Sequence, residues 1–495
     1  MQLKAEMCPQ KKFNSFKVQD VLRFISDDCQ DIFVVKYEAW GLTKLENNTI
    51  IHSKHIGFIL LKGVKRMGFD FSNQTIKQYM YQGNFGLEKE SLRVNGEGFL
   101  AHTKHPFPDN PNIDRDFCEN QVELITDVHD SVDGLWEQIF ALHKQVVRTL
   151  FELPGGREFL WPFSNPPYVK GERDIPIASF DGKLKGKERY REYLASKYGK
   201  KKMLFSGIHF NFSFSDALLE AGYKNSDFNS YTDYKNSIYL ELAKKVTRYS
   251  WLIVYLTAAS PVMDGSFFTD EALGKDILKN YASPRCSEIG YWNDFIPMLD
   301  YSHLDAYVDS IQAYIDDGQL QTAAELYYPV RLKPAGENSL ENLKKTGINH
   351  IELRMFDLNP LSPIGVFKED LEFIHLLIIY LMSLDDTEFE SFEQAMAIKN
   401  VKRAARFDVR DIWIETGWNT AFDVRDAALK ILFGMERFFR EFENGEWMRM
   451  IYSHRQRIAF RELRYAEKIR EEFQKDYVKN GLKLTKQYAE NMMKG

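Results

Sequence analysis

Cysteine is scarce in this 495-residue sequence, and none of it stands at the spacing of a metal or redox motif. Cys8, Cys29, Cys118 and Cys286 form no CxxC pair, which excludes a zinc knuckle and a thioredoxin-like active site. Scattered cysteines in a long chain are typical of a reducing compartment. We therefore expect a cytoplasmic protein that does not depend on disulfides.

Long hydrophobic runs are missing as well. The longest, Trp251–Ala259 and Leu376–Met382, are much shorter than the roughly 20 residues that a membrane-spanning helix needs. The N-terminal sequence MQLKAEMCPQKKF lacks the apolar core of a signal peptide. We expect no membrane partner, and we interpret both apolar runs as buried helices.

The sequence also lacks a strong excess of one charge and a glycine-rich phosphate loop. It has 65 basic and 71 acidic residues, a formal net charge of −6, which gives no reason to expect nucleic acid as a partner. The basic stretch Lys183–Lys202 contains acidic residues at helical spacing, so we interpret it as a solvated helix. Neither GxxxxGK[ST] nor GxGxxG after a strand occurs, which excludes P-loop and Rossmann folds. Any ATP would be held by metal ions and arginines on a sheet.

What the sequence does contain is strict alternation of apolar and polar residues. In Gly207–Ser215 (GIHFNFSFS) every second residue is Ile or Phe, and His209 stands between them. In His350–Phe356 (HIELRMF) the apolar residues alternate with Glu352 and Arg354. Period-two alternation predicts strands with one face on a core. Side by side, such strands predict an antiparallel sheet whose other face carries chemically reactive residues.

Helical spacing appears in Ser131–Leu150, in Tyr234–Ala259 and in nearly all of the chain from about residue 366 onward. The apolar positions of the C-terminal part need a partner surface, so we expect its helices to pack on the sheet. In the N-terminal region, Val18–Ile25 is expected to be a short helix and residues 56–64 a strand.

These patterns predict three regions. Residues 1–75 form an N-terminal extension of unknown role, and residues 76–370 form a catalytic domain that binds ATP and metal on its sheet. Residues 371–495 form a helical region packed on the catalytic body.

Two carboxylates stand close together in GLEKESLRV. Glu88 and Glu90 are two residues apart, so in a strand both point to the same side, about 7 Å from each other. They repel each other unless a cation lies between them. The alternative is a solvated surface strand.

Further polar candidates have similar alternatives. In Asp116–Thr126 (DFCENQVELIT), Asp116 and Glu123 lie on a strand that sends Glu123 away from its apolar neighbours, or on the wet side of an amphipathic helix. His209 is a ligand or a structural histidine. Glu352 and Arg354 are a plain ion pair, or a metal ligand beside an arginine that binds phosphate. Oxygen ligands with one histidine and no thiolate favour magnesium or manganese over zinc.

At these motifs the sequence resembles the bacterial glutamate–cysteine ligases, and especially the ligase portion of the bifunctional glutathione synthases. The matching segments span roughly residues 80–370 in the family's order, and they include GNFGLEKESLRV, GIHFNFSFS and HIELRMFDLNPLSPIGV. The resemblance implies an α+β fold: a glutamine-synthetase-like antiparallel sheet forming a curved funnel, with packed helices and a helical C-terminal region.

The resemblance also implies roles for individual residues. The metal ligands would be Glu88, Glu90, Asp116, Glu123, His209 and Glu352. The catalytic arginines would be Arg354, Arg248 and Arg191, of which the first two would bind phosphate. The substrate-binding tyrosines would be Tyr190, Tyr255 and Tyr291.

The implied reaction is ATP-dependent ligation of the γ-carboxylate of glutamate to the amine of cysteine, through a γ-glutamyl phosphate, as the first step of glutathione biosynthesis. ATP and Mg²⁺ would be required, with Mn²⁺ as the alternative metal, and the enzyme would be a monomer or homodimer. No ATP-grasp domain precedes the last residue, Gly495, so we expect no glutathione synthase activity. The alternatives are a related carboxylate–amine ligase with other substrates and an inactive relative with a regulatory or binding role.

Overall fold

The computed structural model describes residues 13–25, 31–44, 50–62, 68–154, 156–268, 279–386, 389–417 and 420–494. The chain divides into two compact units, Met1–Met67 and Gly68–Gly495. The three-region organisation expected from the sequence stays a prediction.

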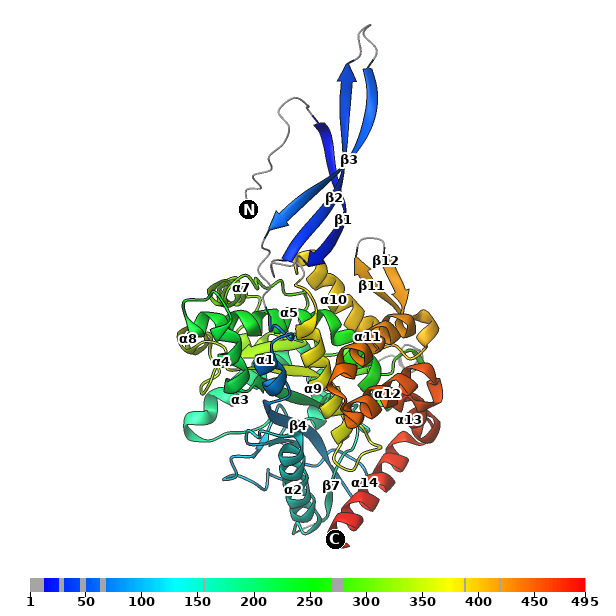
Figure 1. Cartoon of the computed structure of the whole chain (residues 1–495). Coiled ribbons are helices and arrows are strands. Elements are labelled where there is room, and N and C mark those ends of the chain that lie inside the picture. The colour runs from blue at the N-terminus through cyan, green and yellow to red at the C-terminus, as the bar shows by residue number, and fades with distance from the viewer. Residues whose placement is uncertain are drawn as a thin grey trace. The chain divides into compact units, whose positions relative to one another are not determined.

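The first unit contains three antiparallel strands in the order β1 (Phe13–Ile25), β2 (Asp31–Lys44) and β3 (Ile50–Lys62) (Figure 1). The short helix predicted at Val18–Ile25 is wrong, because this segment is the second half of β1. Its pairing with β2 outweighs the local helical spacing of its apolar residues. The strand predicted at residues 56–64 is confirmed as far as Lys62, and the last two residues lie outside the described part of the chain.

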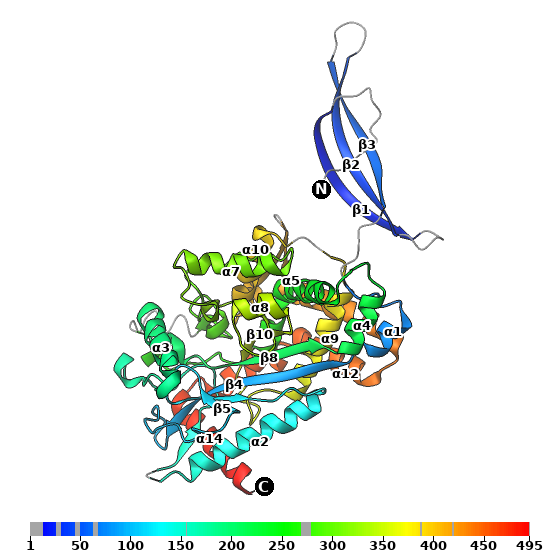
Figure 2. The same cartoon turned by 90° about the vertical axis from the view of Figure 1, so that its left-hand side faces the viewer.

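The second unit is built on one antiparallel sheet with the strand order β5-β6-β4-β8-β10-β9, and β7 pairs with β4. Figure 2 shows β4 and β8 side by side, between α2 and α5. The strands are β4 (Gly83–Asn95), β5 (Ile113–Arg115), β6 (Gln121–Ile125), β7 (Glu158–Leu160), β8 (Gly207–Phe214), β9 (Val330–Lys333) and β10 (His350–Asp357). The predicted antiparallel sheet is confirmed, and Glu123 lies on a strand rather than on a helix.

One face of this sheet, here called the covered face, packs against helices. The alternation in β8 buries Phe210, Phe212 and Phe214 on it. The covering helices are α2 (Val132–Phe151), α5 (Tyr231–Thr257) and α9 (Lys368–Ser383). The helices predicted at Ser131–Leu150 and Tyr234–Ala259 are therefore confirmed within a few residues. Ser131 caps α2 by accepting a hydrogen bond from the Gly134 amide.

The remaining helices of the sheet region are shorter. They are α1 (Gln74–Tyr79), α3 (Lys185–Tyr198), α4 (Asp216–Lys224), α7 (Leu304–Asp316) and α8 (Leu340–Thr346). In α3 only Leu194 and Tyr198 are buried, as expected for a solvated helix in the basic stretch.

The C-terminal part is mostly helical. After α9 come α10 (Ser391–Ala404), α11 (Val424–Phe439), α12 (Gly445–Ala459), α13 (Tyr465–Phe473) and α14 (Tyr477–Lys494). The expectation of nearly continuous helix overlooked a hairpin, β11 (Trp413–Gly417) and β12 (Thr420–Asp423), whose aromatic and β-branched residues favour strands. Within the helical part, the buried Asp370 carboxylate of α9 accepts hydrogen bonds from Arg457 of α12 and Tyr465 of α13.

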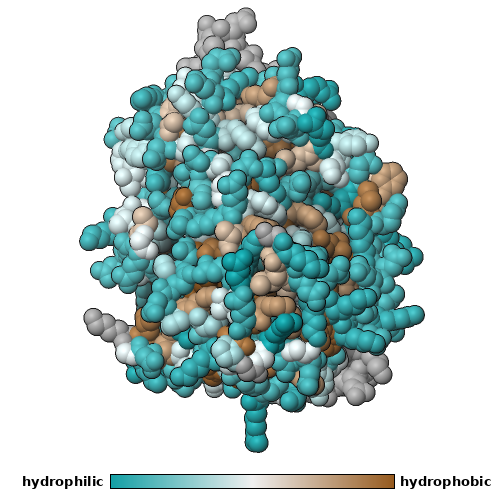
Figure 3. All heavy atoms as spheres, turned by 90° about the horizontal axis from the view of Figure 1, so that it is seen from below, coloured by the Kyte–Doolittle hydropathy of each residue, from teal (hydrophilic) through white to brown (hydrophobic). Residues whose placement is uncertain are grey.

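None of the described helices combines the length and the apolar composition that a membrane-spanning segment needs. Figure 3 shows one face of the molecule, which hydrophilic residues cover for the most part, with hydrophobic residues visible between them in small areas.

Candidate active site

Acidic residues of β4, β6 and β10 and the histidine of β8 meet on the side of the sheet opposite the covered face, here called the carboxylate face. Glu90 of β4 lies opposite Glu123 of β6, and Glu88 of β4 lies opposite His209 of β8. On β10, Glu352 lies opposite Asn211 of β8. Directly opposite residues point to the same face, so the register gathers side chains that are far apart in the sequence.

At the centre of this face, two carboxylates and one imidazole lie together, with His209 and Glu352 buried and Glu88 partly exposed. His209 Nδ1 lies 2.9 Å from Glu88 Oε2 and 3.9 Å from Glu352 Oε1. One ligand atom from each of the three residues lies within 4.8 Å of the others. On the other side of the ring, His209 Nε2 lies 3.7 Å from Glu90 Oε1. His209 is 5% exposed and Glu352 is 1% exposed, so water screens these charges only weakly.

Acidic side chains crowd together toward β6. Burial, Asp116 and Glu88 raise the pKa of Glu123 well above its ordinary value. Burial and Asp116 raise the pKa of Glu90 to about 8, although the nearby guanidinium groups of Arg285 and Arg354 lower it. Asp116 therefore belongs to the same acidic group. Carboxylates that raise one another's pKa are stabilised by a cation placed among them.

The donor set fits a divalent cation that prefers oxygen. Burial and the charge of Arg354 lower the pKa of His209, so its imidazole is neutral and can offer a lone pair. Asn211 Oδ1 is buried and, among the described residues, has no hydrogen-bond partner, so it is a further free acceptor. Several carboxylates, one neutral imidazole and no thiolate suit Mg²⁺ or Mn²⁺.

Basic residues border the other edge of the cluster. Glu352 receives a hydrogen bond from Arg354 (Nη1–Oε2 3.1 Å) and an ion pair from Lys333 (Nζ–Oε1 3.2 Å). Burial opposes ionisation of Glu352, but Arg354 and Lys333 outweigh it and hold the pKa of this carboxyl well below its ordinary value. A positive edge beside a metal-binding group is the arrangement that a nucleotide triphosphate requires.

Aromatic residues form the third wall. The hydroxyl groups of Tyr291 and Tyr327 contact each other, and their ring centroids lie 3.8 Å apart. Both rings line a small cavity of about 60 Å³ together with Arg285 and Arg354. Tyr190 of α3 is close enough to contribute to the raised pKa of the Tyr291 hydroxyl, whose largest cause is burial.

Arg191 binds the backbone rather than the cluster. Its guanidinium donates to the carbonyl oxygens of Asp116 and Arg115, and it lies 4.8 Å from the ring centroid of Phe180. Arg191 therefore fixes the segment that carries Asp116.

Two predicted residues, both on α5, lie in other surroundings. Arg248 lines a separate cavity of about 1000 Å³ with Trp251, and its guanidinium lies 5.3 Å from the ring centroid of Phe389. Tyr255 is buried under the guanidinium of Arg464, 4.9 Å from its ring centroid. The structure does not bring these two side chains into the carboxylate cluster, and their roles stay predictions.

Four residues of this site were not identified from the sequence. They are Arg285, Tyr327, Arg331 and Lys333. The first lies in SPRCSEIGY and the others lie in ELYYPVRLKP, where Arg331 and Lys333 alternate as strand residues of one face do. This alternation could have indicated a strand with both basic side chains on one face, but a pattern in a strand of four residues is too short to distinguish from chance.

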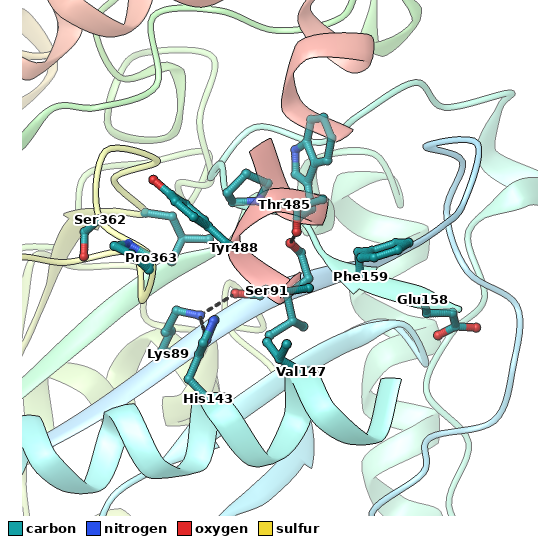
Figure 4. A pocket seen from close by; sticks show the side chains of 16 residues that line it. Lys89, Ser91, His143, Val147, Glu158, Phe159, Ser362, Pro363, Thr485 and Tyr488 are labelled. Carbon is teal, nitrogen blue, oxygen red and sulfur yellow. Dashed lines mark hydrogen bonds between the residues drawn. The ribbon is translucent and has the colours of Figure 1, made fainter. Parts of the chain in front are cut away.

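The covered face of β4 carries a different polar group (Figure 4). Lys89 Nζ lies 3.0 Å from Ser91 Oγ and 3.1 Å from His143 Nδ1 of α2. Burial lowers the pKa of Lys89 to about 7. The cavity at this group has a volume of about 20 Å³, which is room for about one water molecule. We interpret the group as structural.

A family model and several known proteins match this chain. The family model for glutamate–cysteine ligase matches residues 69–404. The chain belongs to the glutamate–cysteine ligase family. It is 37% identical over 434 residues to the glutathione biosynthesis bifunctional protein GshAB of Listeria innocua, covering 84% of this chain and 56% of the relative. A GshAB protein of Clostridium perfringens is 39% identical over 342 residues, covering 66% of this chain and 43% of the relative. The chain thus spans about half the length of the curated relatives it matches.

Two solved structures share the fold of this family member. The bifunctional glutathione synthetase of Pasteurella multocida superposes with a TM-score of 0.75 at 27% identity, covering 87% of this chain and 55% of the other. The glutamate–cysteine ligase of Francisella tularensis, in complex with AMP, superposes with a TM-score of 0.74 at 23% identity, covering 83% of this chain and 89% of the other.

Proposed function

We propose that this chain is a glutamate–cysteine ligase, which joins the γ-carboxylate of glutamate to the amine of cysteine with hydrolysis of ATP to ADP and phosphate. The observation that carries the proposal is the group of Glu88, His209 and Glu352 beside Arg354. This group would bind a metal ion, and Arg354, which donates a hydrogen bond to Glu352, would supply the positive charge that binds phosphate. The relatives that make glutathione and the Francisella structure in complex with AMP support the same reaction.

The metal site would use the whole carboxylate cluster. Mg²⁺, when bound, neutralises the triphosphate and the glutamate carboxylate and aligns the two. Glu88, His209 and Glu352 would hold one ion, since their ligand atoms already lie within 4.8 Å of each other. Glu90 and Glu123 lie opposite each other on β4 and β6, so with Asp116 they would hold another. We also propose that the sheet forms a glutamine-synthetase-like funnel around this site.

Arg354 would stabilise the phosphoryl group in transfer. Its guanidinium is held by Glu352, and the charges of Glu352 and Glu90 raise its pKa despite burial, so it stays charged. A fixed cation in a poorly hydrated site stabilises the charge that spreads over the phosphoryl oxygens. The γ-glutamyl phosphate formed in this step would react with the free amine of cysteine and release phosphate.

The aromatic wall would receive the amino-acid substrates. Tyr291 lines the small cavity with Arg354, and Tyr190 is close enough to raise the pKa of the Tyr291 hydroxyl, so the two rings would offer an aromatic surface beside the phosphoryl site. Arg191 would act on Asp116 through its backbone hydrogen bonds. Arg248 and Tyr255 are not needed for this proposal.

The test is a coupled assay of ADP release with purified protein, Mg²⁺, ATP, glutamate and cysteine, with each component omitted in turn. We expect sustained ADP release only with both amino acids, and formation of γ-glutamylcysteine in equal amount. ADP release with other amino-acid pairs but not with this one would identify a related carboxylate–amine ligase. No release with any pair would refute the proposal.

A further inference from the structure

Three described arginine and lysine residues lie within 4.0 Å of Glu352, and Lys333 is the one lysine among them. Arg331 is bound to the backbone, since its Nε donates to the Leu326 carbonyl (2.7 Å) and its Nη2 to the Ala324 carbonyl (2.7 Å). Arg354 is held by its hydrogen bond to Glu352. Lys333 is the last residue of β9, and its side chain is 14% exposed. Its ammonium is a compact charge on a flexible stem that can move between partners.

Lys333 and a divalent cation at the proposed metal site would compete for the same carboxylate. Lys333 Nζ lies 3.2 Å from Glu352 Oε1, the oxygen that also lies 3.9 Å from His209 Nδ1 at the proposed metal site. Within the described part of the chain, Glu352 is the one carboxylate in salt-bridge range of the Lys333 ammonium.

A cation bound by Glu88 and Glu352 would repel an ammonium at this distance, because the buried site screens charge poorly. Lys333 would then need another anion. A phosphate oxygen is the anion that both the metal and Arg354 would attract to this position, and a lysine binds phosphate well as a point charge.

Resting on the proposed function, we propose that Lys333 is a further catalytic residue, which leaves Glu352 when the metal binds and contacts the phosphoryl group in transfer. In that step the bond from the γ-phosphorus to the bridging oxygen breaks and ADP leaves with the electron pair. A new bond forms from the γ-phosphorus to the γ-carboxylate of glutamate. Lys333 keeps its protons throughout and stabilises the oxygens of the phosphoryl group.

If Lys333 moves from Glu352 to the phosphoryl group, Lys333→Met should strengthen metal binding and yet weaken catalysis. Without nucleotide, Mn²⁺ should bind about tenfold more tightly, because a competing charge is gone. With substrates, kcat for ADP release should fall about a hundredfold, because a cation at the phosphoryl group is lost. A lysine that only orders Glu352 predicts the opposite for Mn²⁺, namely weaker binding.

The experiment measures Mn²⁺ binding by calorimetry on the protein alone and ADP release on the same preparations. Lys344→Met is the matched control, since Lys344 pairs with the exposed Asp309, and it should leave both quantities unchanged. Should Lys333→Met fail to fold, Lys333→Gln, which can still hydrogen-bond to Glu352, carries the same two expectations.

The outcomes separate this inference from the proposed function. Weaker Mn²⁺ binding by the Lys333 variant, or turnover equal to wild type, overturns the role of Lys333 while the ligase proposal stands. A wild-type protein that neither binds Mn²⁺ nor releases ADP with glutamate and cysteine overturns both.

Discussion

The charged side chains on the two faces of β4 have opposite kinds of neighbours. On the carboxylate face, Glu88 and Glu90 meet further acids from neighbouring strands, and like charges gather. On the covered face, the partners of Lys89 are the neutral side chains of Ser91 and His143, and burial lowers the pKa of Lys89 to about 7. Glu88, Lys89 and Glu90 are consecutive, so the difference comes from the direction of the side chains and not from composition.

This contrast separates function from stability. A group of like charges is unfavourable for folding and is useful only when a cation binds there. A hydrogen-bonded group without competing charges stabilises the packing of a helix on a sheet, and its cavity has room for about one water molecule only. Substitutions on the carboxylate face should therefore change catalysis, and substitutions on the covered face should change stability.

The largest effect is expected for Glu352→Gln. Gln preserves the shape of the side chain and removes the charge that the metal would share with Arg354. ADP release should fall at least about a hundredfold, while the circular dichroism spectrum stays that of the wild type. Near-normal turnover at ordinary magnesium concentrations would show that the carboxylate face does not hold the metal.

A second comparison uses two arginines. Arg354→Ala should lower kcat about a hundredfold, whereas Arg248→Ala should lower it less than about tenfold, because Arg248 lies in the separate cavity on α5. Both are measured as ADP release at saturating substrates. Equal losses would support the role that the sequence resemblance implies for Arg248.

Lys89→Met tests the covered face. His143 would lose its hydrogen-bond partner, so the free energy of unfolding in urea should fall by about 1–3 kcal/mol. Turnover at a temperature where the variant is folded should stay within a factor of about three of wild type, on the scale of substitutions that touch no reacting group. A hundredfold loss of turnover without loss of stability would contradict the separation of the two faces.

The smallest effect concerns His375 of α9, which is 1% exposed on the covered face and stacks on Tyr81 with 4.4 Å between ring centroids. Burial lowers its pKa from 6.5 to about 3. Between these values the unfolded chain binds more protons than the folded one, so stability falls as the pH falls through this window, by up to about 1.4 kcal/mol per pH unit. His375→Leu should reduce that slope.

The measurement is urea unfolding of wild type and variant at several pH values from 6.5 to 5. The control is His102→Leu, since the His102 side chain is 57% exposed. The expectation fails if the slopes of wild type and His375→Leu agree.

Local patterns in the sequence were sufficient for the elements and for part of the site. Alternation predicted β8 and β10 and the faces of their residues, and the spacing of Glu88 and Glu90 predicted that they share a face. Helical spacing predicted α2 and α5. In each case the reason is that side-chain direction within one element follows from its period alone.

Only the tertiary structure decided which faces meet. Strand register brings Glu123 opposite Glu90 and Lys333 into contact with Glu352, and packing of separate loops brings Tyr327 onto Tyr291. Contacts between segments this far apart depend on the pairing of whole strands and on the packing of the core, which no window of sequence contains. The same limit explains Arg248 and Tyr255: helical spacing placed them on α5, but the neighbours of each side chain were set by the helices packed around it.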